Sequence, residues 1–284
     1  MVQSRIFYQT EVPRIKIGIC ALSAHNAIFS QYPTDSSDLS HSRMPRFFDP
    51  QPLTVGAVVA LPEHIVHHIR VLRLGLDDII TLFNGQGGEY TATLATIDKK
   101  HAAAEIKAFS PREAELPYVI KLAQALPEAA KMDWIIEKAV ELGVNAIQPL
   151  AAQRCVMRLS AERAKKKVEH WQGIIASAAE QCGRNRLAHL AEPMDFHHWI
   201  ERKELHPRIL LSPRADQSLA DWARHQPPQS VTLVIGPEGG FTDREEDAAM
   251  AQGAMMLSVG QRVLRTETAG LAAISALNAL WGEM

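Results

Sequence analysis

The chain has 284 residues, 46% of them hydrophobic and 22% charged, a composition typical of a soluble globular protein of about two domains. Its net charge of −2 argues against a generally basic nucleic-acid binder, and its three cysteines, which show no CxxC spacing, favour a reducing cytoplasm over a disulfide framework or zinc site. The longest uncharged stretch near the C-terminus has 15 residues, between Glu267 and Glu283, which is too short to span a membrane.

Residues 1–43 differ from the rest of the chain. Arg14 and Lys16 precede a mildly apolar run, but His25 and Asn26 interrupt it and no small-residue cleavage site follows. A secretory signal is therefore not predicted. We expect a poorly ordered extension, consistent with a start codon assigned too far upstream.

Residues 44–116 alternate apolar and polar side chains between turn signals, which predicts short strands. The predicted strands are Thr54–Ala60, Ile79–Phe83, Glu89–Ile97 and Ala102–Phe109. One amphipathic helix is expected over His64–Leu72. Several short strands with one helix predict a small β-barrel domain, followed by a linker over Pro111–Pro117.

Residues 117–284 change to an alternation of strands and helices. Strands are predicted at Val119–Ala125, Ala146–Leu150, Arg208–Leu211, Val231–Gly236 and Met255–Val259. Helices are predicted from Pro127 to Gly143, from Ser160 to Gly183, at about 218–225 and 243–251, and over Thr266–Trp281. This order indicates an α/β domain with a mostly parallel sheet and helices on both faces.

Two loops that follow strands are candidates for a ligand site. The strand Val231–Ile235 runs into a glycine-rich segment, 236–240, and Thr242 with Glu245 forms a capping box for the next helix. The second loop begins at Gly260 and leads into the last helix. Ligands bind at the carboxyl ends of parallel strands, but neither loop matches a known phosphate-binding pattern. A simple tight turn therefore remains an alternative for the glycine-rich segment.

The charges are segregated along the chain. Eight basic and three acidic residues lie between Ala152 and Leu190, which suits contact with a polyanion. A solvated helix face explains the same pattern equally well. His64, His67 and His68 have no further partner in a metal-binding motif, so no metal is predicted, and Cys155 and Cys182 are expected to be packing residues.

Six motifs together resemble one known family, the ribosomal RNA small subunit methyltransferases E. They are 44–48 (MPRFF), 68–73 (HIRVLR), 137–143 (EKAVELG), 180–184 (EQCGR), 235–241 (IGPEGGF) and 260–269 (GQRVLRTETA). The resemblance covers Met44 to Met284. It implies a PUA-like β-barrel domain at 44–116 and a SPOUT methyltransferase domain at 117–284, with a C-terminal trefoil knot, in a homodimer.

The resemblance also implies a reaction, the transfer of a methyl group from S-adenosyl-L-methionine (SAM) to N3 of one uridine in the decoding region of 16S rRNA. Assembled small ribosomal subunits are the expected substrate. The residues implied for cofactor binding are Leu211, Ser212, Gly236, Pro237, Glu238, Gly239, Ser258, Gly260, Arg262, Val263, Leu264 and Arg265.

Methylation at N3 requires loss of the N3 proton, because a neutral imide nitrogen is a poor nucleophile. Arg265 and Arg154 are candidates to stabilise the uracil anion, and Glu267 or Glu238 to accept the proton. Each glutamate also has a structural alternative, which for Glu267 is to complement the positive N-terminus of its helix and for Glu238 is to cap the following helix. The identity of the base stays open.

RNA binding is expected to involve basic residues of both domains: Arg46, Arg70, Arg73, Arg154, Arg158, Lys165 and Lys166, with the neighbouring Lys167. Two other functions remain to be tested. The chain could be a ribosome-assembly factor that only binds RNA, although such a protein has no need of a cofactor pocket. It could also be a SPOUT enzyme that acts on tRNA.

Overall fold

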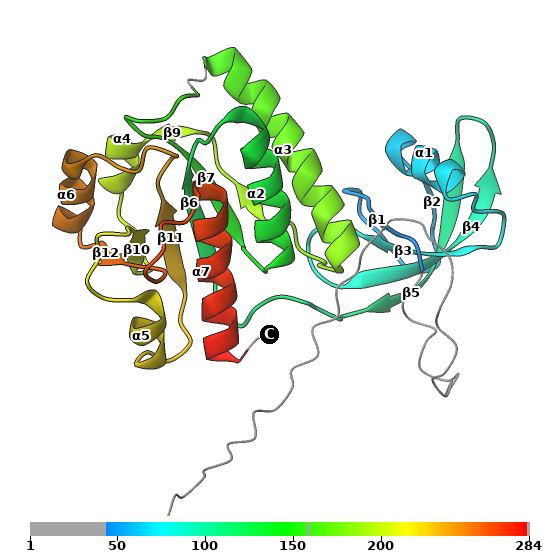
Figure 1. Cartoon of the computed structure of the whole chain (residues 1–284). Coiled ribbons are helices and arrows are strands. Elements are labelled where there is room, and N and C mark those ends of the chain that lie inside the picture. The colour runs from blue at the N-terminus through cyan, green and yellow to red at the C-terminus, as the bar shows by residue number, and fades with distance from the viewer. Residues whose placement is uncertain (1–43, 158–159, 283–284) are drawn as a thin grey trace, which may run out of the picture. The chain divides into compact units, whose positions relative to one another are not determined.

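The computed structural model describes residues 44–157 and 160–282, which form two sheets with two separate hydrophobic cores (Figure 1). The expectation for residues 1–43 lies outside the described residues. Within the described part of the chain, no helix is long and apolar enough to cross a membrane.

The first sheet has five strands in the order β1-β3-β4-β5-β2. The elements are β1 (Arg46–Phe48), β2 (Val58–Ala60), α1 (Glu63–Val71), β3 (Ile79–Phe83), β4 (Glu89–Ile97) and β5 (Ala102–Ser110). Strand β1 runs parallel to β3 and the other pairs are antiparallel. The predicted barrel is thus a mixed sheet in which the path of paired strands ends at β1 and β2.

One predicted strand is much shorter than expected. The structure has a turn at residues 55–56, and strand β2 begins only at Val58. Gly56 has a positive φ of 87°, and the N–H of Ala57 donates to the carbonyl of Thr54 at 3.1 Å. The alternation of apolar residues therefore predicted too long a strand, because the chain turns at Gly56.

The second sheet is parallel, with the order β12-β10-β11-β6-β7-β8 and the short β9 paired to β7. Its strands are β6 (Ile120–Ala125), β7 (Ala146–Ala151), β8 (His189–Leu190), β9 (Met194–Asp195), β10 (Arg208–Leu211), β11 (Val231–Ile235) and β12 (Met255–Leu257). All five residues of β11 are buried. A central parallel strand is covered on both faces, which explains its uninterrupted apolar sequence.

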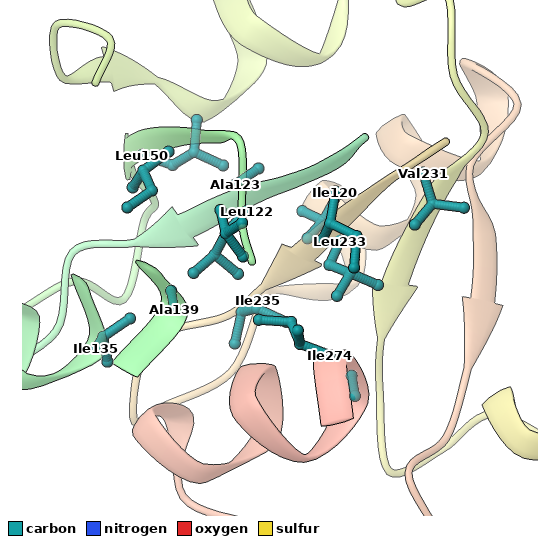
Figure 2. Close-up of a cluster of buried hydrophobic side chains, with 14 of the residues drawn as sticks. Ile120, Leu122, Ala123, Ile135, Ala139, Leu150, Val231, Leu233, Ile235 and Ile274 are labelled. Carbon is teal, nitrogen blue, oxygen red and sulfur yellow. The ribbon is translucent and has the colours of Figure 1, made fainter. Parts of the chain in front are cut away.

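Six helices accompany this sheet: α2 (Ala129–Glu141), α3 (Ala161–Cys182), α4 (Phe196–Ile200), α5 (Leu219–Arg224), α6 (Asp243–Ala251) and α7 (Thr266–Trp281). Figure 2 shows α2 and α7 against one face of the sheet, with Ala139 and Ile274 close to Ile235. Helix α4 instead packs against α6 and β7. The predicted mostly parallel α/β domain is confirmed, whereas the trefoil knot stays a prediction.

The helix ends follow the signals in the sequence. The Ser160 side chain accepts a hydrogen bond from the N–H of Arg163 and begins α3, and Gly183, in the left-handed conformation, ends it. The predicted capping box of Thr242 and Glu245 is present at the start of α6. Helix α4, with five residues, and strands β8 and β9, with two residues each, were not identified from the sequence.

Candidate active site

A cavity of about 860 Å³ opens where strands β10, β11 and β12 end. Four segments line it: 211–214 after β10, 235–241 after β11, 259–260 after β12, and 262–267 at the start of α7, with Lys131, Arg154, Asp243, Glu246 and Ala269. Because the strands are parallel, their carboxyl ends meet at one edge of the sheet and bring these distant loops together.

In the glycine-rich loop 236–240, backbone segments pack close to one another. A Cβ on Gly236 would lie 3.2 Å from the backbone nitrogen of Phe241, so a side chain there would push on backbone atoms. Gly240 has a positive φ of 67°, and its N–H closes a turn on the carbonyl of Pro237 at 2.8 Å. The loop is thus a tight turn, and Pro237 and Glu238 are its residues with side chains at the cavity.

Glu245 joins this loop to the segment that follows β7. Its Oε2 accepts from the N–H of Thr242 at 2.8 Å, and its Oε1 accepts from the N–H of Gln153 at 2.7 Å. The residue is 1% exposed. Its carboxylate therefore holds the two segments at a fixed separation, which places Arg154 beside the glycine-rich loop.

Arg154 lies on the cavity wall, where its guanidinium is already engaged. Nη1 donates to the carbonyl of Gly239 at 2.9 Å and to that of Phe241 at 3.2 Å. These bonds fix the glycine-rich loop as well as the arginine. Arg265 differs, since its side chain is 82% exposed and its nearest acidic partner, Glu267, is 3.9 Å away.

Glu238 forms an ion pair across the cavity wall. Its Oε1 accepts from Lys131 Nζ at 2.7 Å and from the N–H of Glu128 at 3.1 Å. Burial by itself raises the pKa of this carboxyl, but the two donors outweigh burial and hold the pKa of Glu238 below its ordinary value. The expected role of Glu238 as a cap is not seen, because Thr242 and Glu245 cap α6.

Glu267 stands in the first turn of α7 with its side chain 16% exposed. Its Oε2 is buried and receives no hydrogen bond from any described residue. Most buried carboxylate oxygens have a donor, so this one is unusual. Glu267 lines the same cavity as Glu238, Arg154 and Arg265.

Eleven of the twelve residues implied for cofactor binding line the cavity, and Ser258 is the exception. The Ser258 hydroxyl donates to the carbonyl of Gln217 at 3.3 Å, and its N–H donates to the same oxygen at 2.9 Å. The next residue, Val259, contributes to the wall in its place.

Lys131, Arg214 and Phe241 also line the cavity but were not predicted from the sequence as site residues. Arg214 binds Asp243 at 2.7 Å and also contacts Glu246. Arg214 lies three residues after the end of β10, and because ligands bind at the carboxyl ends of parallel strands, this position could have marked it as a site residue. No signal pointed to Lys131, because only the fold brings α2 to Glu238.

Most basic residues expected to bind RNA lie away from the cavity. Arg70, Arg73, Lys165 and Lys166 are exposed, and Arg158 lies outside the described residues. Arg46 is placed differently from the expectation. Its side chain is 13% exposed, forms an ion pair with Glu89 at 2.5 Å and stacks on the Phe83 ring. The charge of Arg46 is therefore neutralised within the protein.

Arg46 also contacts the loop after α3, donating to the carbonyl of Arg184 at 3.0 Å and to the side chain of Asn185. Arg184 itself is 2% exposed and forms a bidentate pair with Glu115, at 2.9 and 2.6 Å. The motif 180–184 therefore has a structural role, because it fastens the segment 110–116 to α3.

Among the described residues, no group of three or more His, Cys, Asp or Glu side chains is arranged to hold a metal ion. Burial raises the pKa of the Cys155 thiol, which favours its unreactive neutral form.

Comparison with known proteins assigns the two sheets to two domain families. Residues 114–278 match the RNA methyltransferase domain, and residues 61–107 match the RNA methyltransferase PUA domain. The fold and the cavity together define an RNA methyltransferase.

Individual relatives are more specific. The chain is 32% identical over 244 residues to ribosomal RNA small subunit methyltransferase E of Buchnera aphidicola subsp. Schizaphis graminum, covering 85% of this chain and 98% of that protein. It is 31% identical to the protein of that name in Bacillus subtilis, covering 76% and 87%. The chain belongs to the ribosomal RNA small subunit methyltransferase E family.

Two solved structures are similar over most of the chain. One is ribosomal RNA small subunit methyltransferase E of Neisseria gonorrhoeae bound to SAM, with a TM-score of 0.79 and 38% identity, covering 84% of this chain and 98% of that one. The other is a Legionella pneumophila protein in complex with the cofactor SAM, with a TM-score of 0.79, 36% identity and the same coverage.

Proposed function

We propose that this enzyme transfers a methyl group from SAM to N3 of a uridine in the decoding region of 16S rRNA, in the assembled small subunit in the cytoplasm. One observation carries the proposal: the cavity at the ends of β10, β11 and β12 in a chain that matches small-subunit rRNA methyltransferases over most of its length.

The cavity suits SAM in size and lining. About 860 Å³ falls within the range of cavities that enclose a small ligand. Leu211, Ile235 and Leu264 supply apolar surface for an adenine ring, and Arg214, which pairs with Asp243 and Glu246, adds polar groups to the wall.

SAM supplies an electrophilic methyl group, so the protein contributes orientation and electrostatics. Arg154 keeps the glycine-rich loop in one conformation through its bonds to Gly239 and Phe241. Arg265, which is exposed at the opening, is placed to stabilise negative charge on the uracil oxygens.

The exposed basic residues fit a proposed RNA-binding role. Arg70 and Arg73 follow one another around the end of α1, and Lys165 and Lys166 lie near the start of α3. Such side chains neutralise phosphates and position the RNA, while the target base enters the cavity. We assign Arg46 to structure instead.

We also propose the division into domains at 44–116 and 117–284, and a homodimer. Helix α7 supports the dimer: Ile274 and Leu277 are buried in the protein, whereas the opposite side, with Ala276, Ala279 and Leu280, is partly or fully exposed. Light scattering in solution tests the proposed dimer directly.

The decisive experiment follows labelled methyl from SAM into small subunits that lack the modification, with free 16S rRNA and bulk tRNA in parallel. We expect 3-methyluridine in 16S rRNA, formed fastest in assembled subunits. Label in tRNA would keep the chemistry and refute the substrate. Absence of both methyl transfer and SAM binding would instead support the assembly factor.

A further inference from the structure

Two glutamates reach the cavity, Glu238 from the glycine-rich loop and Glu267 from the start of α7. Either is chemically able to take a proton from a bound base. The uracil N3–H must lose its proton because the nitrogen lone pair is otherwise delocalised into two carbonyl groups. The surroundings of the two carboxylates distinguish them.

Glu238 is stabilised as an anion by donors that it already has. Lys131 Nζ lies 2.7 Å from its Oε1, and the N–H of Glu128 lies 3.1 Å from the same oxygen. These bonds lower the pKa of Glu238 despite the opposing effect of burial. A carboxylate held in this way is a weak base, because protonation would weaken both bonds.

Glu267 has the opposite surroundings. Its side chain is largely buried, yet Oε2 accepts no hydrogen bond from any described residue, including the N–H groups of its own helix. Glu267 therefore makes no capping hydrogen bond through Oε2, and its charge lies in the first turn of α7, where it also complements the positive helix N-terminus. An ionised carboxylate only accepts hydrogen bonds, and Oε2 is buried without one, so the Glu267 anion lacks the hydrogen-bond stabilisation that Glu238 receives.

Two positive charges face Glu267 from two elements. Arg265 is the N-cap residue of α7, and its Nη1 lies 3.9 Å from Glu267 Oε1. Lys131 on α2 interacts electrostatically with Glu267 as well as with Glu238. Since Arg265 is exposed at the cavity mouth, a uracil could meet a cation at a carbonyl oxygen and a proton acceptor at the neighbouring nitrogen.

We propose that Glu267, and not Glu238, is the general base of the reaction. Its carboxylate takes the N3 proton while the N3 lone pair forms a bond to the methyl carbon of SAM. The methyl–sulfur bond breaks with its electron pair on sulfur, which leaves S-adenosylhomocysteine, and the proton then passes from Glu267 to water. This assignment rests on the proposed methylation of uridine N3.

The test compares wild-type enzyme with Glu267→Gln, Glu267→Asp and a matched control, Glu137→Gln. Glu137 lies on α2 outside the cavity lining, with its side chain 46% exposed. Methyl transfer to unmodified small subunits is measured from mildly acidic to alkaline pH, SAM affinity by calorimetry, and folding by thermal melting. We expect kcat of Glu267→Gln to fall by about 100-fold or more near neutral pH, with unchanged SAM affinity and melting temperature.

The pH profile separates a base from a merely structural residue. The wild-type and Glu137→Gln rates should level off as pH rises, whereas Glu267→Gln should continue to rise because hydroxide must remove the proton. Glu267→Asp keeps a carboxylate and should be slower, with a profile that still levels off. Subunits that contain 5-fluorouracil, whose N3–H is more acidic, should partly rescue Glu267→Gln.

Three results would overturn the assignment. An unchanged kcat of Glu267→Gln would exclude the residue, and a weaker SAM affinity that accounts for the whole loss would make it a ligand of the SAM ammonium group. A wild-type product other than 3-methyluridine would refute the proposed function and this inference together. Wild-type formation of 3-methyluridine with either of the first two results would refute only the role of Glu267.

Discussion

The hydroxyl of Thr266 donates a hydrogen bond to the carbonyl of Gly236 at 2.5 Å, joining the first residue of α7 to the residue that follows β11. Thr266 is 6% exposed, and its oxygen also accepts from Gln124 Nε2 at 2.9 Å. Gln124, on β6, is fully buried. A buried relay across three elements therefore ties together the two loops that form the cavity.

Replacing the Thr266 hydroxyl should loosen the cavity. Thr266→Val keeps the shape but leaves Gln124 Nε2 and the Gly236 carbonyl without this partner, at a cost of about 1–3 kcal/mol. We expect weaker SAM binding and a lower melting temperature, measured by calorimetry and thermal melting. Thr266→Ser retains the hydroxyl and should stay near wild type; equal losses in both variants would contradict the relay.

Arg265→Ala should impair chemistry and not folding. The side chain is 82% exposed and its closest ion-pair distance is 3.9 Å, so little packing is lost. Removing a cation that stabilises developing negative charge typically costs about 100- to 1,000-fold in kcat. Steady-state methyl transfer and thermal melting check this, with Arg224→Ala on α5 as the exposed control. Full activity of Arg265→Ala would remove it from the reaction.

The Glu238–Lys131 pair should make stability depend on pH. Because the pKa of Glu238 is lowered by folding, its contribution is present above the unfolded-state pKa and is lost as pH falls through the folded value. Lys131 has a raised pKa, mainly through its bond to Glu238, so its contribution is lost only as pH rises through that alkaline value.

Glu238→Gln should therefore lower stability near neutral pH by roughly 0.2–1 kcal/mol, the range of exposed pairs, since both side chains are more than a quarter exposed. Urea unfolding of both proteins across pH measures the difference. It should disappear in acid, and a difference that is constant at all pH values would contradict the ion-pair explanation.

The buried pair of Arg184 and Glu115 should matter far more for stability. Glu115→Gln leaves the Arg184 guanidinium buried with only carbonyl and amide partners, and the loss of one member of such a pair costs about 3–5 kcal/mol. Denaturant unfolding should show this cost. Glu105→Gln, in an exposed pair with Lys107, serves as the comparison and should change little.

Local patterns in the sequence predicted most elements of the second domain. The run Val231–Ile235, the cap Ser160 and the stop Gly183 each depend on neighbours along the chain, so they could be read without a structure. The first sheet was harder to predict from the sequence. Its β1 pairs parallel to β3, and a glycine shortens the predicted strand at Thr54–Ala60 to Val58–Ala60.

Local patterns were enough to predict the loops that follow β11 and β12, because glycines and strand ends are marked in the sequence and six motifs carry the family resemblance. The roles of the charged residues, in contrast, depend on the folded structure. Glu238 and Lys131 are 107 residues apart, and Arg46 and Arg184 are 138 apart, yet each pair is in contact. Whether a charge is paired, buried or free depends on such contacts, which arise when distant segments pack together.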